Sequence, residues 1–460
     1  MSTYIGQVYS ALHDINEHLP PVKCTSVEQE KSCELCGTLL MLIDLHVVEA
    51  LEKGRESHRE QVKELKKEYD DVIDEVLSFL PVKSLMRLRC VSKSWNTLIY
   101  DPTFVNHHLK RSSRNINLIL YLLLYIPSNG FNFRCFPLRS VPDIIPVLLA
   151  DNLNLQLNDG KGFIGPIGSC NGLLCLIGYF PNKEDILLYI WNPATITLSN
   201  KIVFPCMKFS RLRWMFAFGY DISSNIYKIV AFHPSKNEVR VFNLEDNIWR
   251  NIQSFPIIPI CSAPYSDCQH QLSGINQGVH VSGTLNWLAI RNEFPYEHEI
   301  DWKLITIDQF VIISLDLSTE TYHQLLLPRG FHEVPLIQPT LSQLMGSLCL
   351  SHDFQGTDFI IWQMKEFRIQ ESWTQLFKIS YQRLQIDFSV FTNSVPYGSR
   401  FILFPLCLSE NDNTLILTWN RDKKPIVYNL KDNRVEKTNF DDGIRWFLIK
   451  DYVESLVSTS

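Results

Sequence analysis

The amino-acid sequence predicts an α+β protein of several domains, in which a small three-helix module precedes a larger, mostly β domain. Residues 68–113 carry apolar side chains at helical spacing. From about residue 114 to the end, short aliphatic and aromatic runs alternate with clusters of Asn, Asp, Gly, Ser and Pro, which is typical of many short strands joined by turns. Residues 1–67 are mixed in composition and form an unassigned, partly helical extension.

Apolar spacing and capping residues indicate the three helices. The first has an acidic first turn and one apolar face, made of Val72, Ile73, Val76, Leu77 and Leu80. Pro81 is expected to end it, because proline lacks an N–H and clashes with the preceding turn. Ser84 is expected to cap the second helix, and Ser92 the third, which carries Trp95. Asp101-Pro102 then indicates a turn.

The helical module has more apolar side chains than it can bury. A domain of about 40 residues cannot shield ten or more large apolar groups well by itself. Pro81 and Val82 fall in the expected inter-helix turn, where they have no obvious intramolecular partner. Such a patch predicts a docking surface. The alternative is that the module packs against the β domain as a helical cap.

A loose repeat runs through the β region. An apolar strand leads into Asn or Asp, then a polar turn and often an aromatic residue, in residues 187–198, 239–249, 311–322, 359–373 and 425–435. A kelch-type propeller blade takes about 50 residues, so residues 165–457 would hold roughly six blades. The prediction is a kelch-like β-propeller, with a pair of β-sandwiches as the alternative. The expected core tryptophans are Trp191, Trp249, Trp287, Trp362 and Trp373.

Composition narrows the class of protein. Hydrophobic residues make up 45% and charged residues 20%, as in ordinary globular proteins. The net charge of −6 argues against nucleic acid or a membrane surface as partner. The longest apolar run, residues 116–127, is about half the length that spans a bilayer and predicts a buried strand. Twelve irregularly spaced cysteines and no visible secretory signal favour a reducing compartment, cytoplasmic or nuclear.

The helical region resembles the F-box motif in the form common in plant proteins. The matching residues are Val76, Leu77, Leu80, Pro81, Val82, Leu85, Arg87, Cys90, Val91, Lys93, Trp95, Leu98, Ile99, Pro102 and Phe104. The resemblance implies a three-helix F-box in residues 68–113 that docks on a Skp-type adaptor and, through it, on a cullin. The expected adaptor-binding residues are Val76, Leu77, Leu80, Pro81, Val82, Leu85, Leu88, Val91 and Trp95.

The β region, residues 114–460, resembles the plant F-box-associated domain. Its segments occur in family order: GSCNGLLCL (168–176), WNP (191–193), FGYDISSNIYKIV (218–230), VRVFNLEDNIWR (239–250), GVHVSGTLNWLA (278–289), IISLDLSTETY (312–322), QESWTQLFKI (370–379) and YVESLV (452–457). The resemblance implies a non-catalytic substrate-recognition subunit of a ubiquitin ligase, which recruits an unknown target protein and needs no cofactor. It would act by raising the effective concentration of the target near ubiquitin. Residues 257–277 and 294–308 are the expected recognition loops.

One departure from the F-box pattern concerns its start. Members of the family usually open the motif with Leu-Pro, whereas this chain has Glu68 and Tyr69. Losing one buried leucine contact would weaken adaptor binding by on the order of 2–3 kcal/mol at most. A third hypothesis is therefore that the protein is a variant that binds targets without delivering them to the ligase.

Other motifs in the sequence give weaker indications of function. Cys33 and Cys36 have the spacing of half a zinc site, but an ordinary pair of thiols is favoured because no second pair follows. The glycines of GSCNG (168–172) are expected to permit a tight turn, and His107-His108 to be solvated. No triad, paired carboxylates or metal cluster is recognisable. A β-propeller enzyme or glycan-binding protein with a helical cap is the alternative function.

Overall fold

The computed structural model divides the chain into two compact units, residues 1–107 and 108–460, and each is described by itself. The described residues are 67, 70–113, 117–122, 132–137, 147–148, 163–179, 185–206, 214–260, 278–291, 305–388, 402–409, 414–419, 425–436 and 450–459. Four features predicted from the sequence lie outside them: residues 1–66, the pair Cys33 and Cys36, the residues Glu68 and Tyr69, and most of the two expected recognition loops.

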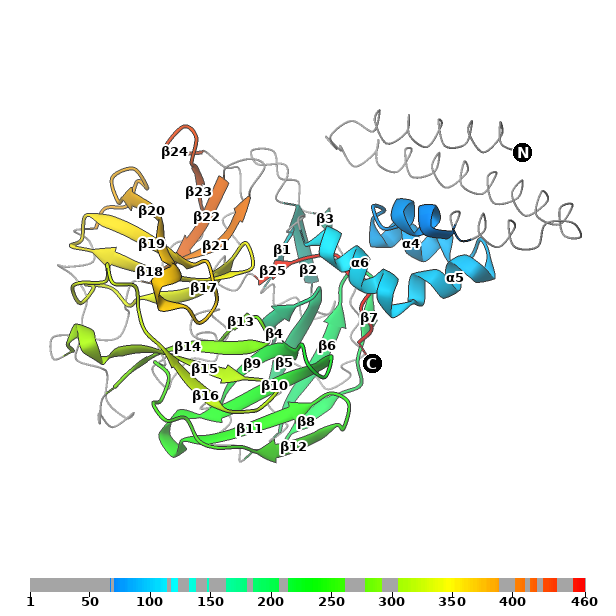
Figure 1. The fold of residues 1–460 in the computed structure, drawn as a ribbon, viewed down its shortest axis with the longest axis horizontal. Coiled ribbons are helices and arrows are strands. Elements are labelled where there is room, and N and C mark those ends of the chain that lie inside the picture. The colour runs from blue at the N-terminus through cyan, green and yellow to red at the C-terminus, as the bar shows by residue number, and fades with distance from the viewer. Residues whose placement is uncertain are drawn as a thin grey trace, which may run out of the picture. The chain divides into compact units, whose positions relative to one another are not determined.

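Helices make up the described part of the first unit (blue to cyan in Figure 1). A helix over residues 70–77 is followed by α4 (Val82–Leu88), α5 (Lys93–Tyr100) and α6 (Pro102–Ser112), of which α6 crosses the boundary between the units. The Ser92 hydroxyl accepts a hydrogen bond from the Trp95 N–H at 3.1 Å, which confirms its predicted capping role. None of the described helices is long and apolar enough to cross a bilayer.

Two predictions about helix boundaries were wrong. Ser84 does not cap a helix, because α4 already begins at Val82, directly after Pro81. Asp101-Pro102 is not a simple turn, because Pro102 is the first residue of a fourth helix. The Asp101 carboxylate accepts a hydrogen bond from the Thr103 N–H at 2.8 Å and so satisfies one free donor of that helix. Pro81 is the N-cap of α4 and Pro102 is the first residue of α6, and at both positions a missing N–H costs little.

The second unit is built of antiparallel sheets. The first sheet contains β25 (Lys450–Tyr452), β1 (Asn117–Leu122), β2 (Asn132–Pro137) and β3 (Val147–Leu148). The second contains β4 (Phe163–Cys170), β5 (Leu173–Tyr179), β6 (Ile186–Asn192), β7 (Thr197–Leu198) and β8 (Ile202–Phe204), which also pairs with β6. The third contains β9 (Met215–Asp221), β10 (Ile226–His233), β11 (Glu238–Asn243) and β12 (Ile248–Asn251).

The remaining sheets follow the same four-stranded plan. The fourth contains β13 (Val279–Val281), β14 (Thr284–Ile290), β15 (Phe310–Asp316) and β16 (Tyr322–Leu325). The fifth contains β17 (Thr340–Leu344), β18 (Ser347–Phe354), β19 (Asp358–Met364) and β20 (Trp373–Ser380), and the sixth β21 (Leu403–Ser409), β22 (Thr414–Trp419), β23 (Ile426–Asn429) and β24 (Arg434–Val435). Short 3₁₀ turns η3 (Pro234–Lys236), η5 (Ile307–Gln309) and η6 (Gln370–Ser372) interrupt the connections.

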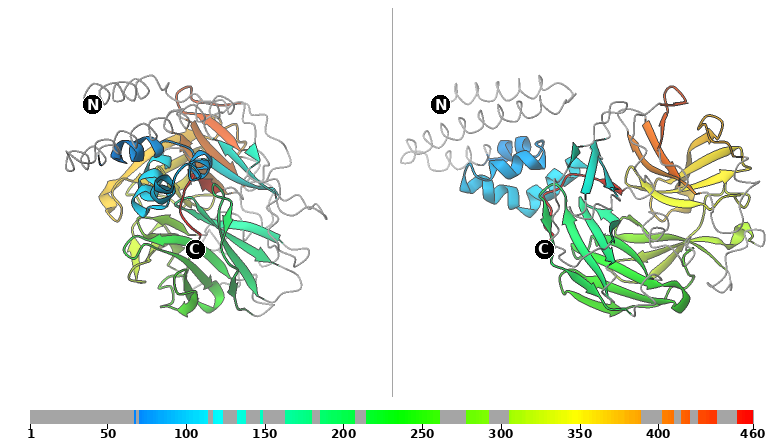
Figure 2. Two further views of the ribbon diagram at one scale, coloured as in Figure 1. Left: turned by 90° about the vertical axis from the view of Figure 1, so that its right-hand side faces the viewer. Right: turned by 180° about the vertical axis from the view of Figure 1, so that it is seen from behind.

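The six sheets of the described residues form a closed ring, seen from further sides in Figure 2. Neighbouring sheets meet through one edge strand each, in the order β25, β4, β9, β13, β17, β21 and back to β25. The ring is closed by the chain end, because β25 pairs antiparallel with β1, with Tyr452 opposite Asn117. The predicted β-propeller is confirmed and the alternative of β-sandwiches is wrong. Strands β1, β2 and β3 of the first sheet lie before residue 165, outside the range that was predicted to hold the blades.

The repeat noticed in the sequence is a hairpin turn. The side-chain oxygens of Asn192, Asn243, Asp316 and Asn429 accept hydrogen bonds from backbone N–H groups two or three residues on, at 2.8–3.3 Å. The residue four positions after each of them has a left-handed backbone. The segment 359–373, in which Met364 holds the corresponding position, does not fit this pattern, because β19 and β20 are joined by a longer connection that contains η6.

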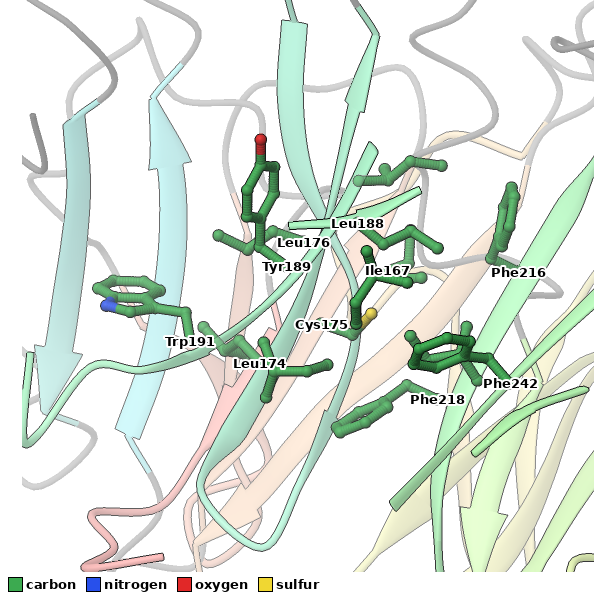
Figure 3. Packing of buried hydrophobic residues seen from close by; sticks show 14 of the residues in the cluster. Ile167, Leu174, Cys175, Leu176, Leu188, Tyr189, Trp191, Phe216, Phe218 and Phe242 are labelled. Atoms are coloured by element: carbon green, nitrogen blue, oxygen red, sulfur yellow. The ribbon is translucent and has the colours of Figure 1, made fainter. Parts of the chain in front are cut away.

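The core of the unit lies between the sheets. Figure 3 shows the largest cluster, in which Ile167 and Cys175 of the second sheet lie beside Phe218 and Phe242 of the third. The predicted core tryptophans pack in or against such clusters: Trp191 and Trp249 in the first, Trp287 in another, and Trp362 and Trp373 in a third. The run at 116–127 contains β1, which confirms the predicted strand, whereas its burial stays a prediction. His108, expected to be solvated, is instead 2% exposed.

The tight turn predicted from GSCNG joins β4 and β5, and it lies against the C-terminal segment (residues 453–459). Asn171 and Gly172 both have positive φ, as the turn requires. A side chain at Gly172 would overlap the Cβ of Ser455 and lie 2.6 Å from the Val453 carbonyl oxygen. Asn192 holds the same segment, because its amide donates to the carbonyls of Ser455 and Val457 at 2.9 and 2.8 Å.

Gly172→Ala is expected to destabilise the propeller more than Gly346→Ala does. Both glycines have a left-handed backbone, which costs an alanine roughly 1–2 kcal/mol. At Gly346 no heavy atom lies within 4 Å of the added carbon, whereas Gly172 would also push the C-terminal segment away, for about 1–3 kcal/mol more. Thermal unfolding of the full chain measures the difference. Equal midpoints for the two variants would contradict the close packing of this segment.

Stability is expected to fall as the pH drops through the range in which histidine titrates. The buried His352 donates from Nδ1 to the Asp353 carbonyl at 2.8 Å and accepts at Nε2 from the Trp362 indole N–H at 3.0 Å. Burial lowers the pKa of His352 below 6.5, so the unfolded chain takes up a proton before the folded chain does. Stability conferred by the neutral ring is therefore complete above about pH 6.5 and is lost below it.

His352→Gln should flatten this dependence. The measurement is the unfolding midpoint of the full chain at several values between about pH 7.5 and 5, compared with wild type. The neighbouring Asp353 contributes in both proteins, and because burial raises the pKa of this carboxyl, its contribution has the opposite slope. Parallel curves for the two proteins would show that His352 is not the titrating group.

Candidate functional site

The structure distributes the nine predicted adaptor-binding residues between two environments. Leu77, Val82, Leu85 and Trp95 are buried, with exposures of 2% or less. The other five are half-buried: Val76, Leu80, Pro81, Leu88 and Val91. Phe79, which is not among the predicted adaptor-binding residues, is 62% exposed.

Val82 corrects the argument that the inter-helix turn leaves an apolar pair without an intramolecular partner. Its side chain is fully buried at the start of α4, beside the equally buried Leu85 one turn on. The four buried residues therefore hold the helices in place. Any direct contact with a partner falls to the half-buried residues and to their exposed neighbours.

The corner between α4 and α5 carries an ordered guanidinium group. Arg89 follows α4, and its Nε–H donates to the Asn96 side-chain oxygen at 3.1 Å. One terminal N–H group of Arg89 points to the Met86 sulfur at 3.4 Å, and the guanidinium carbon lies 4.1 Å from the centre of the Tyr100 ring. Tyr100 itself is 57% exposed. The sequence alone did not indicate this group, because its parts belong to two helices.

Charge is unevenly distributed in the helical unit. Residues 70–75 contain four acidic residues and no basic one, whereas residues 76–100 contain four basic residues and no acidic one. In the acidic segment, Asp74 lies 3.1 Å from the imidazole of His107, which also lies 3.8 Å from Glu75. His107 was predicted to be solvated, but its ring contacts these two carboxyl groups.

A buried ionic cluster joins the third and fourth sheets of the propeller. The Lys228 ammonium lies 3.2 Å from Asp221 and 3.3 Å from Glu320, and it donates to the Leu317 carbonyl. Arg250 binds both carboxylate oxygens of Glu320. Burial raises the pKa of Asp221, but hydrogen bonds from Ser224, Lys228 and Ser223 outweigh it and hold that pKa below its usual value. The contacts of this cluster indicate a structural role.

The buried thiol of Cys170, on β4, contacts a histidine of β13. Its sulfur lies 3.4 Å from Nδ1 of His280, whose Nε2 donates to the Tyr220 carbonyl at 3.0 Å. Burial raises the pKa of Cys170, so the thiol stays protonated and donates to the imidazole. Within the described ranges, no three His, Cys, Asp or Glu side chains are placed to hold a metal ion.

Comparison with known proteins accounts for both units. Residues 148–459 match the model of the F-box associated beta propeller domain, and residues 70–107 match that of the F-box domain. The chain belongs to the family of F-box proteins with an F-box associated β-propeller. The resemblance seen in the sequence is thereby confirmed.

Its relatives include plant F-box proteins. An F-box/kelch-repeat protein of Arabidopsis thaliana is 27% identical over 67% of this chain and 78% of its own length. The F-box protein CPR1 of the same plant is 24% identical over 84% of this chain and 88% of its own length. Among solved structures, TolB from Acinetobacter baumannii superposes with a TM-score of 0.37 at 8% identity, over 76% of this chain and 70% of that one.

Proposed function

We propose that this protein is a non-catalytic substrate-recognition subunit of a cullin-based ubiquitin ligase. The F-box docks on a Skp-type adaptor, and the propeller recruits the protein that is to be ubiquitinated. The observation that carries the proposal is the combination, in one chain, of an F-box with an F-box associated propeller. Such a receptor needs only to hold its target near a loaded ubiquitin carrier.

The role proposed for each unit follows from its surface and its fold. The helical unit has four half-buried apolar residues, Leu80, Pro81, Leu88 and Val91, and the exposed Phe79, which together are called the apolar strip here. A strip of this kind suits an apolar face of a partner protein. The propeller is a rigid ring whose connections can vary without loss of the sheets.

Co-purification of the full chain with a Skp-type adaptor tests the proposal. Leu88→Glu places a charge on the half-buried strip and is expected to abolish capture of the adaptor. Leu326→Glu makes the same chemical change at a 47% exposed position in the propeller unit and should leave capture unchanged. Both variants should unfold at the wild-type temperature within a few degrees.

The same two variants separate the roles of the units. Proteins captured by the propeller should be retained by Leu88→Glu and should accumulate in cells, since they are bound but not delivered. A wild-type chain that captures no adaptor would refute the proposed function. Loss of the captured proteins together with the adaptor would refute the assignment of target binding to the propeller.

A further inference from the structure

We infer that Arg89, held by Tyr100, Asn96 and Met86 at the corner between α4 and α5, is a preformed binding site for a carboxylate side chain of the Skp-type adaptor. This inference rests on the proposed function, because it names the chemistry by which the adaptor is recognised. In Figure 1, α4 and α5 lie side by side, and their contact positions the residues of this corner.

The geometry fixes the guanidinium before any partner arrives. Asn96 holds Nε at 3.1 Å, Met86 receives a terminal N–H group at 3.4 Å, and the Tyr100 ring lies 4.1 Å from the guanidinium carbon. An ordinary surface arginine loses much side-chain freedom when it binds, whereas Arg89 has already lost it on folding. Binding of a partner at Arg89 therefore does not carry the entropic cost of ordering this side chain.

The guanidinium still has donors to offer. Its planar group has five N–H donors, and contacts within the described part of the chain use two of them. The remaining donors lie on terminal nitrogens, and two parallel N–H bonds from an arginine match the two oxygens of a carboxylate. Arginine and tyrosine are also the residues that most often dominate the affinity of protein interfaces.

Charge around the corner favours an acidic occupant. Residues 76–100 carry four basic residues and no acidic one, although the whole chain has a net charge of −6. Lys93 is exposed at the start of α5, close in sequence to Arg89. A local positive field in a negative chain attracts and orients an acidic surface. The apolar strip proposed for the adaptor belongs to the same two-helix region, so one partner would meet both features.

The test measures the affinity of full-length variants for a purified Skp-type adaptor by titration calorimetry. Arg89→Gln is expected to weaken binding by about tenfold or more. Arg87→Gln removes the same charge two residues away, at an exposed position of α4, and should change affinity by about twofold or less. Tyr100→Ala frees the guanidinium and should weaken binding several-fold, whereas Tyr100→Phe keeps the ring and should bind like wild type.

A double-mutant cycle identifies the carboxylate. Each acidic residue of the adaptor is changed to its amide, and one of these changes should lose its effect once Arg89→Gln is present. If Arg89→Gln folds poorly, Tyr100→Ala takes its place in the test, provided that Tyr100→Ala unfolds at the wild-type temperature. Wild-type affinity in Arg89→Gln, or equal losses in the two arginine variants, would overturn the inference and leave the proposed function intact. Failure of the wild-type chain to bind the adaptor would overturn both.

Discussion

Replacing Asp221 by alanine is expected to lower the free energy of unfolding of the propeller by about 3–5 kcal/mol. The reason is the charge that remains. The Lys228 side chain is 5% exposed, and without Asp221 its ammonium keeps the Leu317 carbonyl and a shared Glu320 as partners. An ammonium taken out of water with too few partners is far less stable than the same group in a complete cluster. The unfolding midpoint of the full chain measures the loss.

Two controls separate the buried charge from other effects. Asp221→Asn keeps a side-chain oxygen for the N–H groups of Ser223 and Ser224, but it removes the charge and replaces the oxygen that accepts from the Ser224 hydroxyl by an NH2 group. A loss smaller than that of Asp221→Ala is expected. Arg329→Gln breaks an ion pair with Glu371 whose partners are 77% and 66% exposed, and should cost less than about 1 kcal/mol. A loss no larger for Asp221→Ala than for Arg329→Gln would contradict the buried cluster.

Leu85→Asp in α4 is expected to unfold the F-box and abolish capture of a Skp-type adaptor. Leu85 is fully buried, so the carboxylate of an aspartate at this position would lose its hydration without gaining a partner. This is expected to lower the free energy of unfolding by about 3–5 kcal/mol. A module of some 40 residues has little stability to lose. Hydrogen exchange of residues 70–107, read beside co-purification with the adaptor, measures both effects.

The cause of this loss differs from that of Leu88→Glu. Leu85→Asp removes binding by removing the fold, so exchange protection and adaptor capture disappear together. Leu85→Met keeps the volume and should retain both, within about 1.5 kcal/mol. Adaptor capture by a Leu85→Asp chain whose helices remain protected would show that Leu85 does not support the docking surface.

Local chemistry explains which parts of the fold were predictable. The Asn and Asp residues that begin the hairpin turns bond to backbone groups two or three residues away, so their spacing is visible in the sequence. Ser92 was recognisable as a cap for the same reason. Pro81 was correctly predicted to follow the end of the first helix, and it also directly precedes α4. Pro102 was assigned to a turn although it begins α6, because proline favours both positions.

Contacts between distant parts of the chain were not predictable. The cluster of Lys228 and Glu320 joins two sheets, and the sequence around either residue does not indicate the other as its partner. The candidate site shows the same limit at shorter range. The family resemblance identified the apolar residues of the site. It did not indicate that Val82 and Leu85 are buried, or that Arg89 lies over the Tyr100 ring. Burial and pairing follow from the packing of helices, which single-residue patterns do not determine.

Closure of the ring by β25 sets the order in which the protein can mature. Strand β1 leaves the ribosome early, yet its partner at residues 450–452 is made more than 300 residues later. Until then one edge of the first sheet is open, and an open edge can pair with another chain. Contacts of such long range also form slowly. The chain therefore acquires a complete ring only once synthesis has reached β25, and products that stop earlier have an incomplete propeller.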